Sequence, residues 1–360
     1  MMLQAQEGLL STYRDPLRAR GPLTVLFAAL LVGFYLALYF TEWFTPLAAA
    51  LGLENKWYLY GALYSLAMIV GGWRYLARHG SSRYNVARIA TNVLVQLVLA
   101  FSLPLALTKL GQKDYYFSYF WPLKIEYLYP DTLASLPLFV AGWGVLGALV
   151  AAPVLTLRYG KRWYCSWICG CGALANTFGD PWRHQSNKST LAWRVEQVTI
   201  HATLVVALAT TGVVVAAWAL GPSQPGLVAL AGEVRGAYGF VVGSMLAGVV
   251  GTGLYPVLGS RVWCRFFCPM AALLGLIQKL GRFKIAVKPD MCISCGNCST
   301  YCEMGIDVRM YAQANQSFTR ASCVGCGMCA HVCPRGVLRL ELTGAASAAP
   351  PRHTRLRVLP

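Results

Sequence analysis

The sequence predicts a polytopic α-helical membrane protein with about six transmembrane helices and a small α+β domain near its C-terminal end. Of the 360 residues, 56% are apolar and only 12% are charged, which is too apolar for a chain of soluble domains. The apolar residues gather into long runs, each able to cross about 30 Å of hydrocarbon. Beyond the last run, eight of the 13 cysteines fall into two compact groups.

Six apolar runs are the predicted spans. The first follows a basic start and the pair Gly21–Pro22, and it is too long for the core of a secretory signal, so we expect it to be retained. The runs lie at 23–40, 57–73, 86–107, 133–157, 195–220 and 237–258. A basic tail at 1–21 and a membrane domain at 22–260 are therefore expected.

The net charge of +17 follows from the predicted topology. We assign to one side the start of the chain, the loops after the second and fourth spans, and everything after the sixth. That side then holds all but five of the 31 Lys and Arg residues. Because basic residues collect in cytoplasmic loops, both chain ends and the cysteine-rich domain are predicted on the cytoplasmic face of a bacterial inner membrane. The topology accounts for most of the charge; membrane lipid is an expected partner, and nucleic acid is not.

The two C-terminal cysteine groups share the spacing C-x2-C-x2-C-x3-C. Three thiolates at this spacing hold one iron–sulfur cube, and the fourth, which points away, closes the other cube; structural zinc would need two separated pairs. The predicted ligands are Cys292, Cys295, Cys298 and Cys333 for one cluster, and Cys302, Cys323, Cys326 and Cys329 for the other. Residues 285–340 resemble a bacterial-type two-[4Fe–4S] ferredoxin domain, although Glu303 stands where a second proline often sits. A disordered tail is expected at 341–360.

Further cysteines stand where two predicted spans leave the membrane. The stretch R-Y-G-K-R-W-Y-C-S-W-I-C-G-C-G follows the fourth span, and R-V-W-C-R-F-F-C-P follows the sixth, in a connecting segment at 261–284. Both contain a basic residue, an aromatic residue and C-x3-C, so they look like a repeat. Cysteines four apart on a helix share one face, and two such pairs could converge on one metal ion or a third cluster. These candidate ligands are Cys165, Cys169, Cys171, Cys264 and Cys268.

A quinone or proton-transfer site is a candidate role for one polar group inside a span. His201 is the only titratable residue well inside a span, with Gln197 one turn earlier and Glu196 at the cytoplasmic end. The alternative is a packed, hydrogen-bonded histidine without such a role.

The loop at 108–132 is unusually rich in Tyr, Phe and Trp. Such residues settle at headgroup depth, which predicts an interfacial segment. The alternative is a quinone-ring pocket or a docking face for a periplasmic partner, with Lys124 and Glu126 as its polar groups.

The combination of these pieces resembles the NapH/NosR/CcoG-type membrane ferredoxins, from about the fourth span to Arg339. The resemblance implies a membrane electron-transfer protein between the quinone pool, cytoplasmic clusters and a partner oxidoreductase. It leaves open an accessory factor that reduces or delivers metal during maturation of a respiratory enzyme. Cys264 and Cys268 match the family motif, whereas Gly170 replaces the usual proline of the first motif and Cys171 is an additional thiol.

Overall fold

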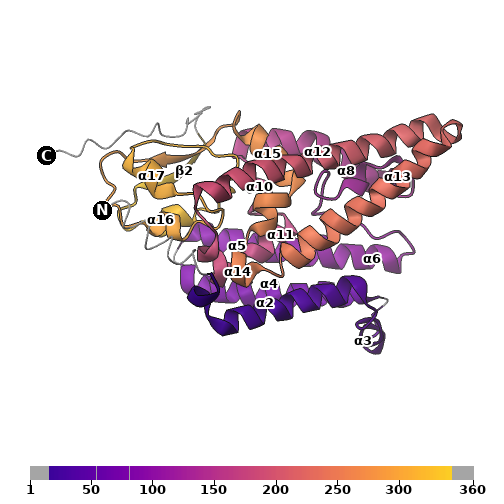
Figure 1. Ribbon diagram of the computed structural model, residues 1–360, viewed down its shortest axis with the longest axis horizontal. Coiled ribbons are helices and arrows are strands. Elements are labelled where there is room, and N and C mark those ends of the chain that lie inside the picture. Colours follow the sequence, from indigo (N-terminus) through magenta and orange to yellow (C-terminus); the bar gives the residue numbers. More distant parts are fainter. Residues whose placement is uncertain (1–15, 54, 81, 343–360) are drawn as a thin grey trace.

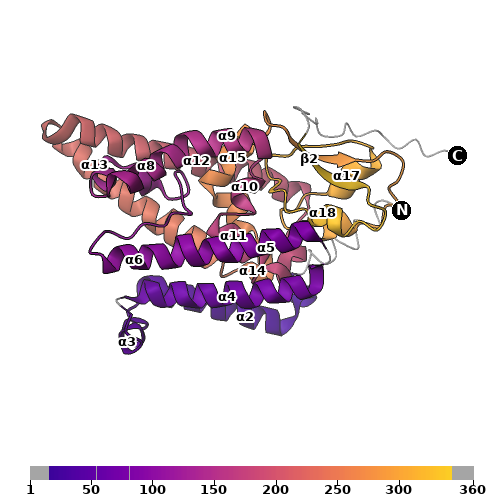
Figure 2. The ribbon, with the colours of Figure 1, turned by 180° about the vertical axis from the view of Figure 1, so that it is seen from behind.

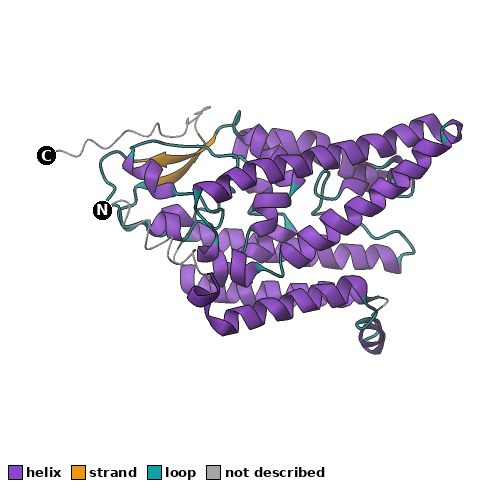
Figure 3. Ribbon diagram, in the orientation of Figure 1, coloured by secondary structure: helices purple, strands orange, loops and turns teal. Residues whose placement is uncertain are grey.

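The computed structural model describes residues 16–342 except 54 and 81. Long helices run lengthwise through the molecule, and a small domain with a two-stranded sheet sits at one end of them (Figures 1 and 3). The mostly helical chain and the small α+β domain are thus confirmed. The predicted tails at 1–21 and 341–360 lie almost entirely outside the described residues.

Helices occupy all six places where the sequence predicts a span. They are α2 (Pro16–Phe40), α4 (Lys56–His79), the continuous α5–η1–α6 (Arg83–Val95, Gln96–Ser102, Leu103–Lys109), α8–η3–α9 (Leu138–Leu146, Gly147–Ala151, Ala152–Tyr159), α12 (Thr190–Leu220) and α13–η6 (Pro225–Tyr238, Gly239–Val250). Within the described part of the chain, four stretches are long and apolar enough to cross a membrane: Gly21–Phe40, Arg83–Lys109, Leu138–Tyr159 and Thr190–Leu220. Charged residues in α4 and α13 make these two helices more polar, and the count of six stays a prediction.

Successive long helices run in opposite directions (Figures 1 and 2). Helices α2, α5 and α12 begin at the end that carries the small domain, and α4, α8 and α13 begin at the opposite end, where the short helix α3 (Thr45–Ala50) lies. The loops after α4 and α9 therefore lie beside the small domain. The predicted topology likewise places the loops after the second and fourth spans on the same side as the cysteine-rich domain.

The last long helix differs from the predicted span at 237–258. It begins at Pro225 and ends at Val250, because Gly251, Gly253 and Pro256 interrupt the helix there. Three short elements follow: α14 (Tyr255–Leu258), η7 (Trp263–Phe267) and α15 (Pro269–Gln278). We call this segment, residues 251–278, the second excursion. An equivalent segment at 160–185, the first excursion, follows α9 and contains α10 (Arg162–Cys165), α11 (Gly170–Asn176) and η4 (Asp180–Gln185). The two excursions contact each other beneath the small domain.

The aromatic loop at 108–132 folds into the bundle. Trp121 donates a hydrogen bond from Nε1 to Oγ1 of Thr211 on α12 (3.1 Å), and the carbonyl of Ser118 accepts one from the Tyr164 hydroxyl (3.0 Å). The loop contains η2 (Ile125–Leu128) and α7 (Pro130–Ala134). Its buried rings are those of Tyr115, Phe117, Phe120, Tyr127 and Tyr129. These rings pack against helices, and the depth of the loop in the membrane stays a prediction.

The small domain is built on two antiparallel strands, β1 (Phe283–Val287) and β2 (Leu338–Leu342). Phe283 and Ile285 on β1 are buried, and Phe318 stacks on Tyr311 at 4.2 Å between ring centres. Its helices are short: α16 (Asn297–Thr300), α17 (Val308–Gln313) and α18 (Met328–His331). The cysteine-bearing loops lie between these elements.

Candidate iron–sulfur sites

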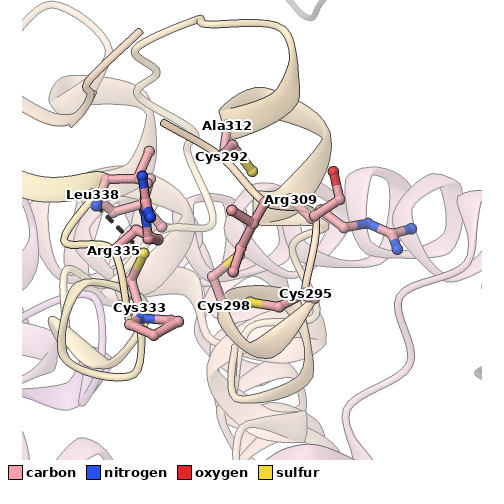
Figure 4. Close-up of a pocket in the computed structure, with 13 residues that line it drawn as sticks. Cys292, Cys295, Cys298, Arg309, Ala312, Cys333, Arg335 and Leu338 are labelled. Atoms are coloured by element: carbon pink, nitrogen blue, oxygen red, sulfur yellow. Dashed lines mark hydrogen bonds between the residues drawn. The ribbon is translucent and has the colours of Figure 1, made fainter. Parts of the chain in front are cut away.

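One cavity in the small domain is lined by all four cysteines predicted for the first cluster. Cys292, Cys295, Cys298 and Cys333 surround it, and Figure 4 shows them around a common space. The backbone N–H of Val337 donates to Sγ of Cys333 (3.4 Å). Because Cys295 is exposed, this set lies at the surface of the molecule.

A second cavity is lined by the other predicted set, Cys302, Cys323, Cys326 and Cys329. Each set thus takes three cysteines from one group and its fourth from the other, as the spacing predicts. Burial raises the pKa of Cys323 to about 12, so its thiol is protonated unless a metal replaces the proton. The donor sets fit two [4Fe–4S] clusters, and which thiols bind iron stays a prediction.

A left-handed glycine precedes a short helix in each cysteine group. Gly296 and Gly327 both have φ +80°, a conformation that favours glycine. The following helices carry Cys298 and Cys329. The two halves of the domain therefore present a cysteine with the same local geometry.

The juxtamembrane cysteines of the two excursions come together in the interior. Cys165, Cys169, Cys264 and Cys268 are all buried. Burial, and then the neighbouring thiols of Cys264, Cys169 and Cys165, raise the pKa of Cys268 well above that of an ordinary thiol. The two pairs therefore lie near one another, and their convergence on one metal ion or cluster stays a prediction.

The expectation that each C-x3-C pair lies on one continuous helix is wrong. Cys165 ends α10, and Cys169 is the N-cap of α11; in the second repeat, Cys264 lies in η7 and Cys268 is the N-cap of α15. Sγ of Cys268 accepts a hydrogen bond from the Ala271 N–H (3.4 Å). A glycine or a proline follows the N-cap, and the exposed N–H groups of a helix start favour a thiolate there.

Buried positive charge lies beside these four thiols. Lys161 and Arg261 are nearly inaccessible to solvent and act electrostatically on the Cys165 thiol. Arg88 and Arg183 are buried as well, and they act on Cys326 of the second set. Nη1 of Arg261 donates to the Cys165 carbonyl (3.1 Å) and contacts Sγ of Cys264 (3.7 Å). Several guanidinium nitrogens of these arginines have no hydrogen-bond partner among the described residues. An anionic group held by four thiolates fits this environment.

The segments that carry the juxtamembrane cysteines are hydrogen-bonded to the loop that lines the second cavity. Ser166, the neighbour of Cys165, donates from Oγ to the carbonyl of Val324 (2.7 Å), which lies between Cys323 and Cys326. Nε2 of Gln278 donates to the carbonyl of Cys323 (3.0 Å). Hydrogen bonds thus connect the membrane domain to the loop that carries three thiols of the inner set.

Glu303 explains the missing proline of the first cysteine group. Its carboxylate is fully buried and accepts from Nη2 of Arg261 (3.0 Å), and it lies 3.5 Å from Nη2 of Arg183. Burial alone would raise the pKa of Glu303, but the charges of Arg261, Arg183 and Arg88 outweigh it and hold the pKa below that of an ordinary glutamate. In the sequence, only the acidic residue at the proline position pointed to this role. The sequence did not predict that Glu303 links the small domain to the membrane domain.

The three residues predicted as a quinone or proton site lie on α12. Glu196 is buried and forms an ion pair with Nε of Arg265 (2.7 Å), beside Cys264. His201 is half-buried, and its Nδ1 lies 2.6 Å from the backbone carbonyl of Gln197. The structure thus links Glu196 to the second excursion, while the quinone role of His201 and Gln197 stays a prediction.

The described side chains do not form a site for a single metal ion. Within residues 16–342, apart from the two gaps, no group of three or more His, Cys, Asp or Glu side chains is close enough to hold one metal ion. The four thiolates of a cube bind four different irons and stand farther apart than the ligands of one ion.

Cys171 is half-buried and follows Gly170, at which an added Cβ would meet the Tyr119 hydroxyl at 2.5 Å. A side chain at this position would require Tyr119 and Gln96 to shift.

Two family models match this chain. A model described as a 4Fe–4S dicluster domain matches residues 285–340, the predicted extent of the small domain. A model described as a 4Fe–4S binding domain matches twice, at 141–188 and at 241–288. Each of these stretches contains one C-x3-C motif, which supports the predicted repeat.

Curated relatives match over part of their length. YccM of Escherichia coli, named for electron transport, is 26% identical over 168 residues, which are 44% of this chain and 46% of YccM. The ferredoxin-type protein NapH of Escherichia coli is 28% identical, over 43% of this chain and 53% of NapH. The methylamine utilization ferredoxin-type protein MauN of Paracoccus denitrificans is 28% identical, over 45% and 56%. The match spans about half the length of these relatives, and no solved structure matches.

Proposed function

We propose that this chain, which belongs to the NapH-type membrane-bound 4Fe–4S ferredoxins, carries electrons between the quinone pool and a partner oxidoreductase. In this proposal it resides in a bacterial inner membrane, with both chain ends and the ferredoxin domain on the cytoplasmic side. The names of the relatives, one electron transport protein and two ferredoxin-type proteins, support an electron-transfer role. The quinone pool, the partner and the topology belong to the proposal.

The observation that carries the proposal is the order of the three cysteine sets. The buried juxtamembrane set lies in the helical bundle, and Ser166 connects it to the loop of Cys323 and Cys326. The outer set follows and includes the exposed Cys295. One-electron carriers in such an order form a relay from the membrane interior to the surface of the molecule.

We further propose that Cys165, Cys169, Cys264 and Cys268 hold a third [4Fe–4S] cluster. Their burial together, the neighbouring charges of Lys161 and Arg261 and the repeated 4Fe–4S match support this assignment. Cys171 is outside this set, because it lies beyond the C-x3-C motif.

The chemistry requires two electrons and two protons. When a quinol is oxidised to a quinone, two one-electron carriers each accept one electron, and the two protons pass to water. The reverse flow would reduce the quinone with two electrons from the carriers and two protons from water. Two or three clusters in one chain match the one-electron steps that a quinol requires.

Redox equilibration with a quinol tests the proposed relay. The full chain, purified anaerobically and placed in liposomes with a menaquinol analogue, should show cluster reduction by low-temperature EPR as the quinol fraction rises. The control is the same preparation without the quinone analogue. If the reduction state of the clusters does not change at any ratio of quinol to quinone, the quinone part of the proposed function is wrong.

Iron analysis tests the third cluster separately. We expect about twelve iron atoms per chain, against about eight for two cubes alone. The variant Cys264→Ser should lose about four of them and keep the EPR signals of the other two clusters. The matched control, Cys171→Ser, should keep the full iron content. Equal iron in Cys264→Ser and the unaltered chain would contradict the assignment.

A further inference from the structure

A cavity of about 330 Å³ lies inside the helical bundle, beside the juxtamembrane cysteines. This volume falls within the roughly 300–1,000 Å³ typical of small-molecule sites. Its wall is mostly aromatic and includes Tyr35, Tyr39, Tyr60, Tyr64 and Tyr119. The aromatic loop therefore contributes to this wall, whereas His201 does not line the cavity.

One side of the cavity is formed by the neighbours of the proposed cluster ligands. Gly170 and Cys171 line it directly after Cys169, and Trp263 lines it directly before Cys264. The hydroxyl of Tyr64 donates to the Gly170 carbonyl (2.9 Å). A molecule in this cavity would touch residues adjacent in sequence to both cysteine pairs.

Two further residues of the wall, Trp263 and Tyr238, are more than nine-tenths buried. Nε1 of Trp263 and the Tyr238 hydroxyl each expose less than 1 Å² of surface, so other protein atoms cover them. These two residues therefore present ring carbons to the cavity, and the wall they add is apolar.

The cavity also has a side open to the exterior of the bundle. Gly243 on η6 lines it and is exposed, and an added Cβ there would meet no atom within 4 Å. Helix η6 carries exposed Phe240 and Val241 beside this position, so the opening lies on an apolar surface. A ligand entering here would come from the lipid.

We propose that this cavity binds the ring of an isoprenoid quinone. The flat aromatic walls suit a ring, and the apolar opening suits its hydrocarbon tail. The position of the cavity beside both cysteine pairs favours a redox-active ring over a lipid acyl chain. The assignment rests on the proposed quinone-linked function and gives that function a location.

Photolabelling tests the location independently of electron transfer. The full chain in nanodiscs is labelled with an azido-substituted benzoquinone that carries a decyl tail, and the labelled peptides are mapped by mass spectrometry. We expect the label on segments that line the cavity, such as α4 and η6. Gly243→Trp should lower this labelling about tenfold or more, because the indole fills the opening without meeting protein atoms at its Cβ. The matched control is Gly239→Trp, an exposed glycine on the same helix that does not line the cavity.

The EPR signals of the clusters check that the fold of both glycine variants is intact. Label on α12 around His201, or equal labelling in Gly243→Trp and Gly239→Trp, would overturn the site. If the cavity is labelled but menaquinol never reduces the clusters, the site stands and the proposed function fails. If menaquinol reduces them equally in Gly243→Trp, the function stands and the site fails.

Discussion

Replacing Glu303 by glutamine should loosen the ferredoxin domain from the membrane domain. The substitution keeps the shape of the side chain but removes the charge that faces Arg261 at 3.0 Å and Arg183 at 3.5 Å. All three side chains are at most 2% exposed, so water cannot replace the carboxylate. Removing one partner of a buried ion pair costs about 3–5 kcal/mol.

The lower end of this range applies here, because Arg183 keeps a second carboxylate. Its Nε lies 2.7 Å from Oδ1 of Asp180. A cost of about 3 kcal/mol corresponds to a roughly 100-fold increase in the population of the opened state. The other hydrogen bonds between the domains should keep the domain attached for most of the time.

Hydrogen–deuterium exchange measures this opening directly. Amides at 320–330, which lie against the membrane domain, should exchange roughly 100-fold faster in Glu303→Gln if exchange follows local opening. The control is Glu341→Gln, because Glu341 is partly exposed and lies 3.8 Å from Lys284 within the same domain, so its loss should change exchange less than about fivefold. Equal exchange in the two variants would refute the argument that the buried carboxylate holds the domain in place.

Three further outcomes can be checked on the same protein. The folded-state pKa of Glu303 is lowered, so its contribution to stability is complete above about pH 4.3, the pKa of an ordinary glutamate. This contribution is lost as the pH falls through the lower folded-state pKa. Hydrogen exchange corrected for the intrinsic rate should therefore stay constant between about pH 8 and 5. Tyr84→Phe removes the hydrogen bond from its hydroxyl to the Gly325 carbonyl (2.9 Å), and the resulting cost of about 1 kcal/mol should raise exchange at 323–327 about fivefold. Gly147→Leu should displace Phe120, whose ring leaves no room for a Cβ there, and protease cleavage within 108–132 should increase, whereas Gly142→Leu, with open space at its Cβ, should not have this effect.

The sequence was sufficient for the parts of the fold that depend on local pattern. The thiol spacing led to the two sets of four that line the two cavities, because each set is fixed by a short loop and one distant cysteine. The apolar runs led to all six long helices. The repeat of C-x3-C led to the proximity of two cysteine pairs, although the pairs flank helix starts and do not share one helix.

Features that depend on contacts between distant segments could not be predicted in this way. Glu303 pairs with residues far away in the chain, and a pattern of neighbours does not reveal such a pair. The cavity is formed by residues from several helices and the aromatic loop, and its position depends on how these pack. The aromatic residues of its wall, such as Tyr238 and Trp263, are ordinary in the sequence.

The short connection between the two domains decides how electrons can move. Helix α15 ends at Gln278 and β1 begins at Phe283, and within this connection the Arg282 N–H donates to the Leu157 carbonyl (2.8 Å). Gln278 itself accepts a hydrogen bond from the Lys161 N–H (2.8 Å). The ferredoxin domain therefore cannot swing on a tether to collect an electron at one place and deliver it at another. Donor and acceptor stay at fixed separations, so the rate of transfer between them should not depend on solvent viscosity.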